Sequence, residues 1–120
     1  MQRDSDNKVL EAIKKHNMIF VSAQPDSTYF HWQVSLYLYQ FAKHNISNQC
    51  YVLFGYTGIR PSKYVQDLMK DNKNIIAYKD TRSKATKIYI PTIRPYLLKK
   101  FFKDRPELGK MYFIMIQIYF

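Results

Sequence analysis

Short apolar runs alternate with helical segments along this chain, and this alternation restricts the folds that it can adopt. Continuous apolar runs are typical of buried parallel strands, whereas a helix that covers a sheet shows one apolar stripe. The apolar runs are residues 18–21, 49–54, 74–78 and 111–120. The helical segments are residues 28–43, 61–69 and a third that begins at Pro91. We therefore predict an α/β fold with a mostly parallel, Rossmann-like sheet and helices on both faces.

The chain is long enough for one domain. Its 120 residues are 47% hydrophobic, which supports a core and argues against disorder. Residues 1–17 are mostly polar and charged, and their apolar positions Val9, Leu10 and Ile13 predict a short amphipathic helix. Residues 18–120 contain the βαβ units, so we expect a single α/β domain that follows an N-terminal helix.

The charge of the chain favours anionic partners. Lys and Arg number 19 against 9 acidic residues, a net charge of +10 that suits nucleotide phosphates, nucleic acid or an acidic membrane surface. The basic residues are scattered, which is typical of a solvated surface. No apolar run approaches the roughly 20 residues needed to span a bilayer, and the charged N-terminus does not resemble a signal peptide. We expect a cytoplasmic protein.

Metal and nucleophile chemistry have little support in the sequence. Cys50, the only cysteine, lies in an apolar run and is expected to be a buried thiol, and the three histidines lack metal-ligand spacing. Asp4 and Asp6 have the Asp-x-Asp spacing of a divalent-cation site, but they lie in a polar segment and suit helix capping better. We predict no metal site and no catalytic residue in this chain.

The stretch from Met18 to Gln33 has the pattern of a strand, a turn and an aromatic-rich helix. Residues 23–27 have turn chemistry, and Asp26 or Ser27 would cap the helix that follows. The first strand-to-helix turn of an open α/β sheet commonly holds the phosphates or base of a ligand. No Gly-x-Gly-x-x-Gly follows this strand, which argues against a dinucleotide fold.

Two short motifs resemble those of one glycosyltransferase family. Tyr29-x-x-Trp32-Gln33, just after a strand and an Asp-containing turn, resembles the start of the hydroxyproline O-arabinosyltransferases and their peptidyl-serine galactosyltransferase relatives. The segment Tyr-Ile-Pro-Thr-Ile-Arg-Pro at residues 89–95 resembles the family's Tyr-Pro-x-x-Asn-Lys-Pro. The resemblance covers residues 18 to 113.

The resemblance implies the N-terminal half of a GT-A-type glycosyltransferase, which transfers a sugar from a nucleotide-diphosphate sugar, such as a UDP-sugar, to an acceptor hydroxyl. In the full-length family it also implies a divalent cation such as Mn²⁺. The turn after the first strand would face the base and ribose. The end of the third strand would reach the nucleoside, and Arg94 would contact the phosphates. The candidate nucleotide-sugar-binding residues are Ala23, Gln24, Asp26, Tyr29, Trp32, Gln33, Lys79, Asp80 and Arg94. Packing of Tyr29 and Trp32 against the sheet is the competing interpretation.

The sequence departs from the family at its end. Where the family has Asp-x-Asp, this chain has the apolar run Met111 to Phe120. If the codons of residues 115–118 are read one base earlier, they encode Asp, then Ser, Pro or Thr, then Asp or Asn. We hypothesise an incomplete GT-A sheet that is frameshifted or truncated near residue 113. Without the metal-binding carboxylates we expect no sugar transfer by this chain.

Two further interpretations remain open. A small basic nucleic-acid-binding or interaction module would use the net charge and the 11 Tyr residues to stack bases, although no RNP-like, KH or helix-turn-helix signature is present. The second interpretation is a remnant that folds poorly, because half a sheet exposes an edge and an apolar face.

The frameshift hypothesis predicts the nucleotide sequence of the gene. We expect the shifted frame to encode Asp-x-Asp across codons 115–118 and to stay open downstream. Sequencing the genomic locus and its transcript measures this directly. An uninterrupted gene with a stop codon after Phe120 and no downstream open frame would contradict the hypothesis.

Overall fold

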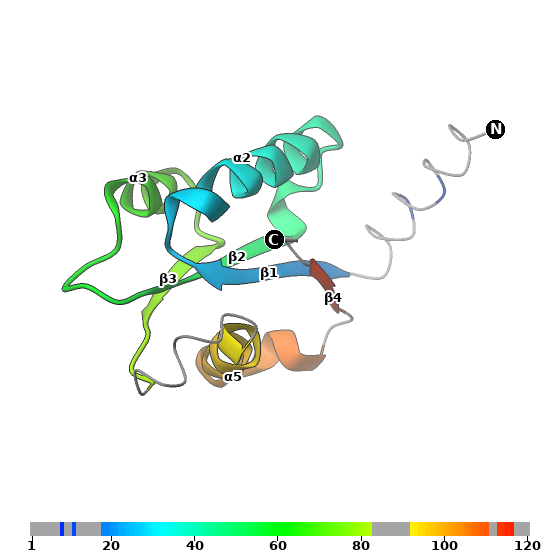
Figure 1. Ribbon diagram of the computed structural model, residues 1–120. Helices are drawn as coiled ribbons and strands as arrows, with labels where there is room; N and C mark the ends of the chain where they lie inside the picture. Colours follow the sequence, from blue (N-terminus) through cyan, green and yellow to red (C-terminus); the bar gives the residue numbers. More distant parts are fainter. Residues whose placement is uncertain (1–7, 9–10, 12–17, 83–91, 111–112, 117–120) are drawn as a thin grey trace.

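Strands and helices alternate along the chain in the computed structural model, which describes residues 8, 11, 18–82, 92–110 and 113–116. The elements are β1 (Ile19–Pro25), α2 (Thr28–Lys43), the 3₁₀ helix η1 (Ser47–Gln49), β2 (Cys50–Tyr56), α3 (Lys63–Asp71), β3 (Ile75–Lys79), α5 (Ile93–Asp104), the 3₁₀ helix η3 (Pro106–Lys110) and β4 (Phe113–Ile116) (Figure 1). The predicted α/β fold is confirmed. No helix among the described residues is long and apolar enough to cross a membrane.

The four strands form one parallel sheet in the order β3-β2-β1-β4. The chain first runs outward from β1 through β2 to β3, and then crosses back to place β4 on the other side of β1. Figure 1 shows α2 and α3 on one face of the sheet and α5 on the opposite face, as the sequence predicts. In open sheets of this kind, ligands bind beyond the carboxyl ends of the strands, where the direction of winding reverses.

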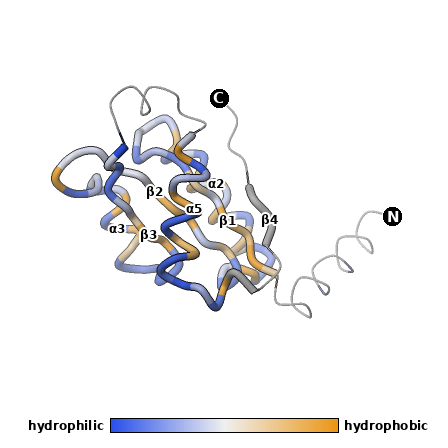
Figure 2. Tube along the Cα trace, turned by 90° about the horizontal axis from the view of Figure 1, so that it is seen from below, coloured by the Kyte–Doolittle hydropathy of each residue, from blue (hydrophilic) through white to orange (hydrophobic). Residues whose placement is uncertain are grey.

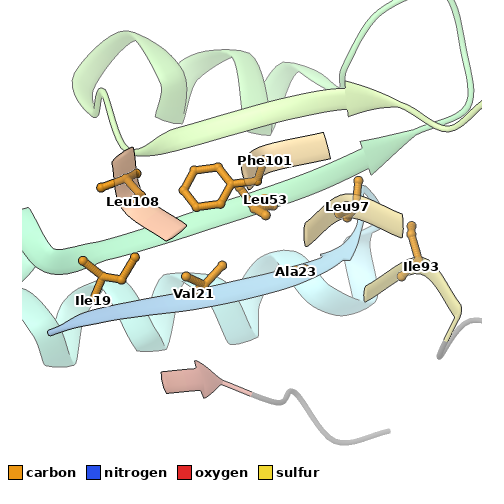
Figure 3. Close-up of a cluster of buried hydrophobic side chains, with 8 residues drawn as sticks. All are labelled: Ile19, Val21, Ala23, Leu53, Ile93, Leu97, Phe101 and Leu108. Carbon is orange, nitrogen blue, oxygen red and sulfur yellow. The ribbon is translucent and has the colours of Figure 1, made fainter. Parts of the chain in front are cut away.

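Each face of the sheet has its own hydrophobic core, because successive side chains of a strand point to opposite faces. On the α5 face the buried residues are Ile19, Val21, Ala23, Leu53, Ile93, Leu97, Phe101 and Leu108 (Figure 3). On the other face they are Phe30, Val34, Cys50, Val52, Phe54, Val65 and Ile75. Figure 2 shows the hydrophobic residues concentrated along β1 and β2, the two central strands.

The bounds of α2 agree with the predicted helical segment 28–43, and one apolar stripe of the helix faces the sheet. Phe30 and Val34 are fully buried, and Tyr37, Leu38 and Phe41 pack against the same core. A stripe at this spacing fixes both the period of a helix and the face that it buries.

Two strands continue further than predicted. Residues 23–25 belong to β1 rather than to a turn, and Gly55 and Tyr56 belong to β2 rather than to a loop. Ala23 is small enough to pack against α5, and the amide of Gln24 donates a hydrogen bond to the carbonyl of Leu53 at 2.9 Å. A polar residue therefore does not end the strand when its neighbour supplies a partner.

Several predicted segments lie outside the described residues. Of the N-terminal segment 1–17 only Lys8 and Glu11 are described, and both are helical. Residues 83–91, which include the first three residues of the 89–95 motif, are likewise outside. So are residues 111–112 and 117–120, and the predicted terminal strand is therefore described only as β4.

Burial makes the thiol of Cys50 unreactive. The residue is 3% exposed, and burial raises its pKa from 9.0 to about 12. The thiolate is the nucleophile, so its fraction at neutral pH falls by about 10³-fold relative to a free thiol. We expect a disulfide reagent such as Ellman's to label the native protein only as fast as it unfolds, and the denatured protein at once. Rapid stoichiometric labelling of the native chain would contradict the buried position.

Candidate functional site

A cavity of about 200 Å³ opens at the carboxyl ends of β1, β2 and β3. Its lining combines apolar side chains with a polar rim: Pro25, Ser27, Phe30, Gly55, Thr57, Asp80, Arg82 and Ile93. Gly55 lets α5 approach the sheet closely, since a Cβ atom there would lie 2.7 Å from Cδ1 of Ile93. The cavity therefore depends on the packing of α5 against the end of β2.

A larger hollow of about 740 Å³ lies at the opposite end of the sheet. Its lining comes from the C-terminal halves of α2 and α3 and from the start of β2 and β3, including Asn48, Asn72 and Lys73. Helix C-termini present carbonyl groups there, whereas the N–H groups that bind anions gather at the carboxyl ends of the strands. We therefore place the candidate site in the smaller cavity.

The N-terminus of α2 borders this cavity. Ser27 is the N-cap residue, and its hydroxyl makes no capping hydrogen bond. The backbone carbonyl of Ser27 accepts hydrogen bonds from the N–H groups of Phe30 and His31 at 3.0 and 3.1 Å. The first turn contains no acidic side chain that would offset the positive end of this 16-residue helix. The dipole of α2 therefore favours an anion beside Ser27, whereas the Asp26 carboxylate, 2.6 Å from Nε2 of His31 in the first turn, opposes it.

An ion pair holds the loop after β3 against the cavity. The Arg82 guanidinium donates from Nε and Nη2 to the two carboxylate oxygens of Asp80, at 2.9 and 2.8 Å. Its Nη1 donates to the hydroxyl of Thr92 next to α5. The side chains of Asp80 and Arg82 are 3% and 9% exposed, and the hydrogen bonds to Asp80 raise the pKa of Arg82. This bidentate geometry keeps Arg82 charged and fixed on the cavity wall.

Tyr96 ties the same loop to α5. Its phenol oxygen accepts a hydrogen bond from the N–H of Thr81 at 3.0 Å and lies 2.8 Å from the hydroxyl of Thr81. Lys100 places its ammonium 5.0 Å from the centre of the Tyr96 ring. Burial alone would raise the pKa of Tyr96, but the hydrogen bonds with Thr81 and the proximity of Lys100 together lower it.

The Asp26 carboxylate joins the turn after β1 to the start of α3. It accepts hydrogen bonds from the backbone N–H and the hydroxyl of Ser62, each at 2.6 Å. Nε2 of His31 lies 2.6 Å from the same carboxylate, and the Asp26 side chain is 3% exposed. The Ser62 hydroxyl in turn caps α3 by accepting from the N–H of Val65. Asp26 therefore stabilises the first turn of α3, a role that sequence reasoning did not assign to it.

Five of the nine candidate residues are at the carboxyl edge or just beneath it: Ala23, Gln24, Asp26, Lys79 and Asp80. Asp80 lines the cavity, and Asp26 lies beside it with its carboxylate bound to Ser62 and His31. Ala23 and Gln24 are buried in the sheet, Ala23 against α5 and Gln24 against β2.

Lys79 and the candidates on α2 and α5 do not line the cavity. Tyr29, Trp32 and Gln33 are on α2 but do not line the cavity, and Tyr29 and Trp32 are exposed. Lys79 is exposed at the end of β3, and Arg94 is half-buried in the first turn of α5. The structure therefore does not bring the aromatic motif and Asp80 together in one pocket.

Sequence reasoning missed most of the cavity wall. Ser27 was considered only as a cap, and Gly55, Thr57, Arg82 and Ile93 were not proposed as site residues. A usable signal is present, because residues that directly follow the strands meet at one edge of a parallel sheet. Asp80 and Arg82, two positions apart after β3, also have the charges of a bidentate pair.

The carboxylates at this edge do not fit a divalent cation. A Mn²⁺-type ion needs several oxygen ligands, yet Asp80 is bound to Arg82, and Asp26 is bound to Ser62 and His31. Within the described part of the chain, no group of three or more His, Cys, Asp or Glu residues could hold a metal ion.

Comparison of the chain with models of protein families, with curated proteins and with solved structures finds no match. The fold and the cavity are therefore the basis for a functional proposal.

The Asp26 network predicts a large effect of a small substitution. Asp26→Asn keeps the size of the side chain but removes the charge and one acceptor for Ser62, so we expect a loss of about 3 kcal/mol in the free energy of unfolding. Urea denaturation followed by circular dichroism measures it. Asp67→Asn is the matched control, because the Asp67 side chain is exposed and its Oδ1 lies 3.8 Å from Nζ of Lys70. This substitution should change the free energy of unfolding by less than about 0.5 kcal/mol. Equal effects of the two substitutions would contradict the role of Asp26.

Proposed function

We propose that this chain binds a nucleoside diphosphate, or its sugar conjugate, at the carboxyl edge of the sheet, as the donor-binding part of a GT-A-type glycosyltransferase. One observation carries the proposal: the N-terminus of α2 and the guanidinium of Arg82 border the same cavity. Helix N-termini and arginine are the two groups that proteins use most directly for phosphate.

The size of the cavity indicates which part of the ligand it would hold. Its volume of about 200 Å³ is below the range of about 300–1,000 Å³ that is usual for whole ligands. The diphosphate would lie at the rim beside Ser27 and Arg82, and the apolar side chains of Phe30 and Ile93 would contact one ring or its edge. The rest of the ligand would lie outside the cavity.

The proposed role is donor binding rather than sugar transfer. The link to a UDP-sugar and to this enzyme class rests on the Tyr29-x-x-Trp32-Gln33 and 89–95 motifs of the sequence. Because the carboxylates of Asp26 and Asp80 do not fit a metal ion, no transfer step is assigned to them.

A nucleic-acid-binding module is the second candidate, and the charge of α5 favours it. This helix contains Arg94, Lys99, Lys100 and Lys103, with Asp104 as its only acidic residue. Lys99 and Lys103 are exposed on the surface. A face of this kind would bind a phosphate backbone through charge, with a strong dependence on salt.

Titration of the ¹⁵N-labelled protein with UDP tests the proposal. We expect shifts in the amide signals of Ser27, Gly55, Thr57 and Arg82. Ser27→Tyr should remove these shifts, because the larger side chain fills the cavity. The substitution should leave α2 intact, since the Ser27 hydroxyl makes no capping hydrogen bond. Thr28→Tyr is the matched control: it adds the same side chain one residue later, outside the cavity lining, and should keep the response.

Two outcomes would contradict the proposal. One is a UDP response that survives in Ser27→Tyr, and the other is no response to UDP at all. If single-stranded RNA instead shifts signals of α5 in a salt-dependent manner while UDP shifts none, the second candidate is favoured.

A further inference from the structure

The outer face of α2 presents large apolar side chains to the surface at a regular spacing. Tyr29, Trp32, Leu36 and Tyr39 are 48%, 60%, 52% and 63% exposed. Their separations of three, four and three residues are those of the core positions of a coiled coil, which place side chains along one seam of a helix. We call these four residues the α2 stripe.

The α2 stripe lies on a helix whose only Lys, Arg, Asp or Glu residue is Lys43, its last residue. Residues 28–42 contain no Lys, Arg, Asp or Glu, although the whole chain has 19 basic and 9 acidic residues. His31, the one histidine in this segment, is paired with Asp26. By contrast, the nine residues of α3 include Lys63, Asp67, Lys70 and Asp71. A helix that faces water usually has charged residues on its outer face, so the composition of α2 indicates contact with another apolar surface.

A shallow groove runs beside the stripe. It has a volume of about 280 Å³ and is lined by Trp32, Gln33, Leu36, Tyr37 and Gln40. The polar groups on this lining are uncharged: the amides of Gln33 and Gln40, the phenol of Tyr37 and the indole N–H of Trp32. The groove shares Trp32 and Leu36 with the stripe, so a ridge and a groove lie on the same helix face. Two identical helices can pack ridge into groove across a two-fold axis.

We propose that α2 of one copy of this chain packs antiparallel against α2 of a second copy, through the α2 stripe. The net charge of the chain favours contact through this face. Two chains of charge +10 repel each other wherever basic surfaces meet, whereas the α2 stripe brings no like charges together. An antiparallel arrangement also places the positive end of each helix beside the negative end of the other.

The exposed area sets the strength of this contact. Four half-exposed side chains of this size bury about 400 Å² per copy, which is about half of the 800 Å² per partner of a standard interface. We therefore expect a weak dimer, with a dissociation constant of about 10–100 µM. None of the four stripe residues lines the cavity at the carboxyl edge, so this inference does not depend on nucleotide binding.

Trp32 is the only tryptophan and reports directly on the stripe. We expect sedimentation velocity from about 5 to about 500 µM to show a monomer–dimer equilibrium. Over the same range the emission of Trp32 should shift to shorter wavelength as the ring leaves water. Leu36→Lys and Tyr39→Lys should abolish both changes, because each places a charge in the seam of both copies. Ile59→Lys is the matched control, since Ile59 is 95% exposed and lies outside α2.

Three outcomes would overturn the inference. The first is a monomer over the whole range with a water-exposed Trp32. The second is a dimer that persists in both α2 variants, or that is lost equally in Ile59→Lys, because contact then occurs elsewhere. The third is a Trp32 emission that is already shifted and does not change with concentration, which would mean that a segment of the same chain covers the stripe. Circular dichroism of each variant establishes that the fold is kept.

Discussion

The buried Asp26 carboxylate is the interaction on which the carboxyl edge of this sheet depends. It joins the turn after β1 to α2 through His31, five residues further along, and to the start of α3 through Ser62, 36 residues further along. A buried charge is tolerated only when its donors are in place, so each donor is held as firmly as the carboxylate itself. The same bonds fix the turn that directs the N-terminus of α2 towards the cavity. The site is thus a consequence of how the sheet and its helices are tied together.

A second buried pair completes the edge. Arg82 is both the cation on the cavity wall and the partner of Asp80, so part of its charge is already neutralised. Attraction of an anion therefore depends on several contributions: the dipole of α2, the remaining field of Arg82, and the net charge of +10, which acts over about 10 Å at moderate salt. This distribution favours a phosphate-bearing ligand without requiring any one residue to bind it alone.

The sequence predicts the fold better than the site, for physical reasons. The apolar spacing of Phe30, Val34 and Phe41 determines α2, because helical periodicity is a local property. The end of β1 could not be predicted, since Gln24 and Pro25 pair with Phe54 and Gly55 of β2, and the Gln24 amide bonds to the carbonyl of Leu53, 29 residues away. Asp26 was expected to face a ligand, yet its partner Ser62 is 36 residues further along the chain.

The position of a bound nucleotide tests the central claim most directly. In a crystal structure of the chain with UDP, we expect the diphosphate beside Ser27, at the N-terminus of α2, with an oxygen within hydrogen-bonding distance of Arg82. UDP bound along the basic face of α5, or in contact only with Tyr29 and Trp32, would contradict the account of the carboxyl edge as a nucleotide site.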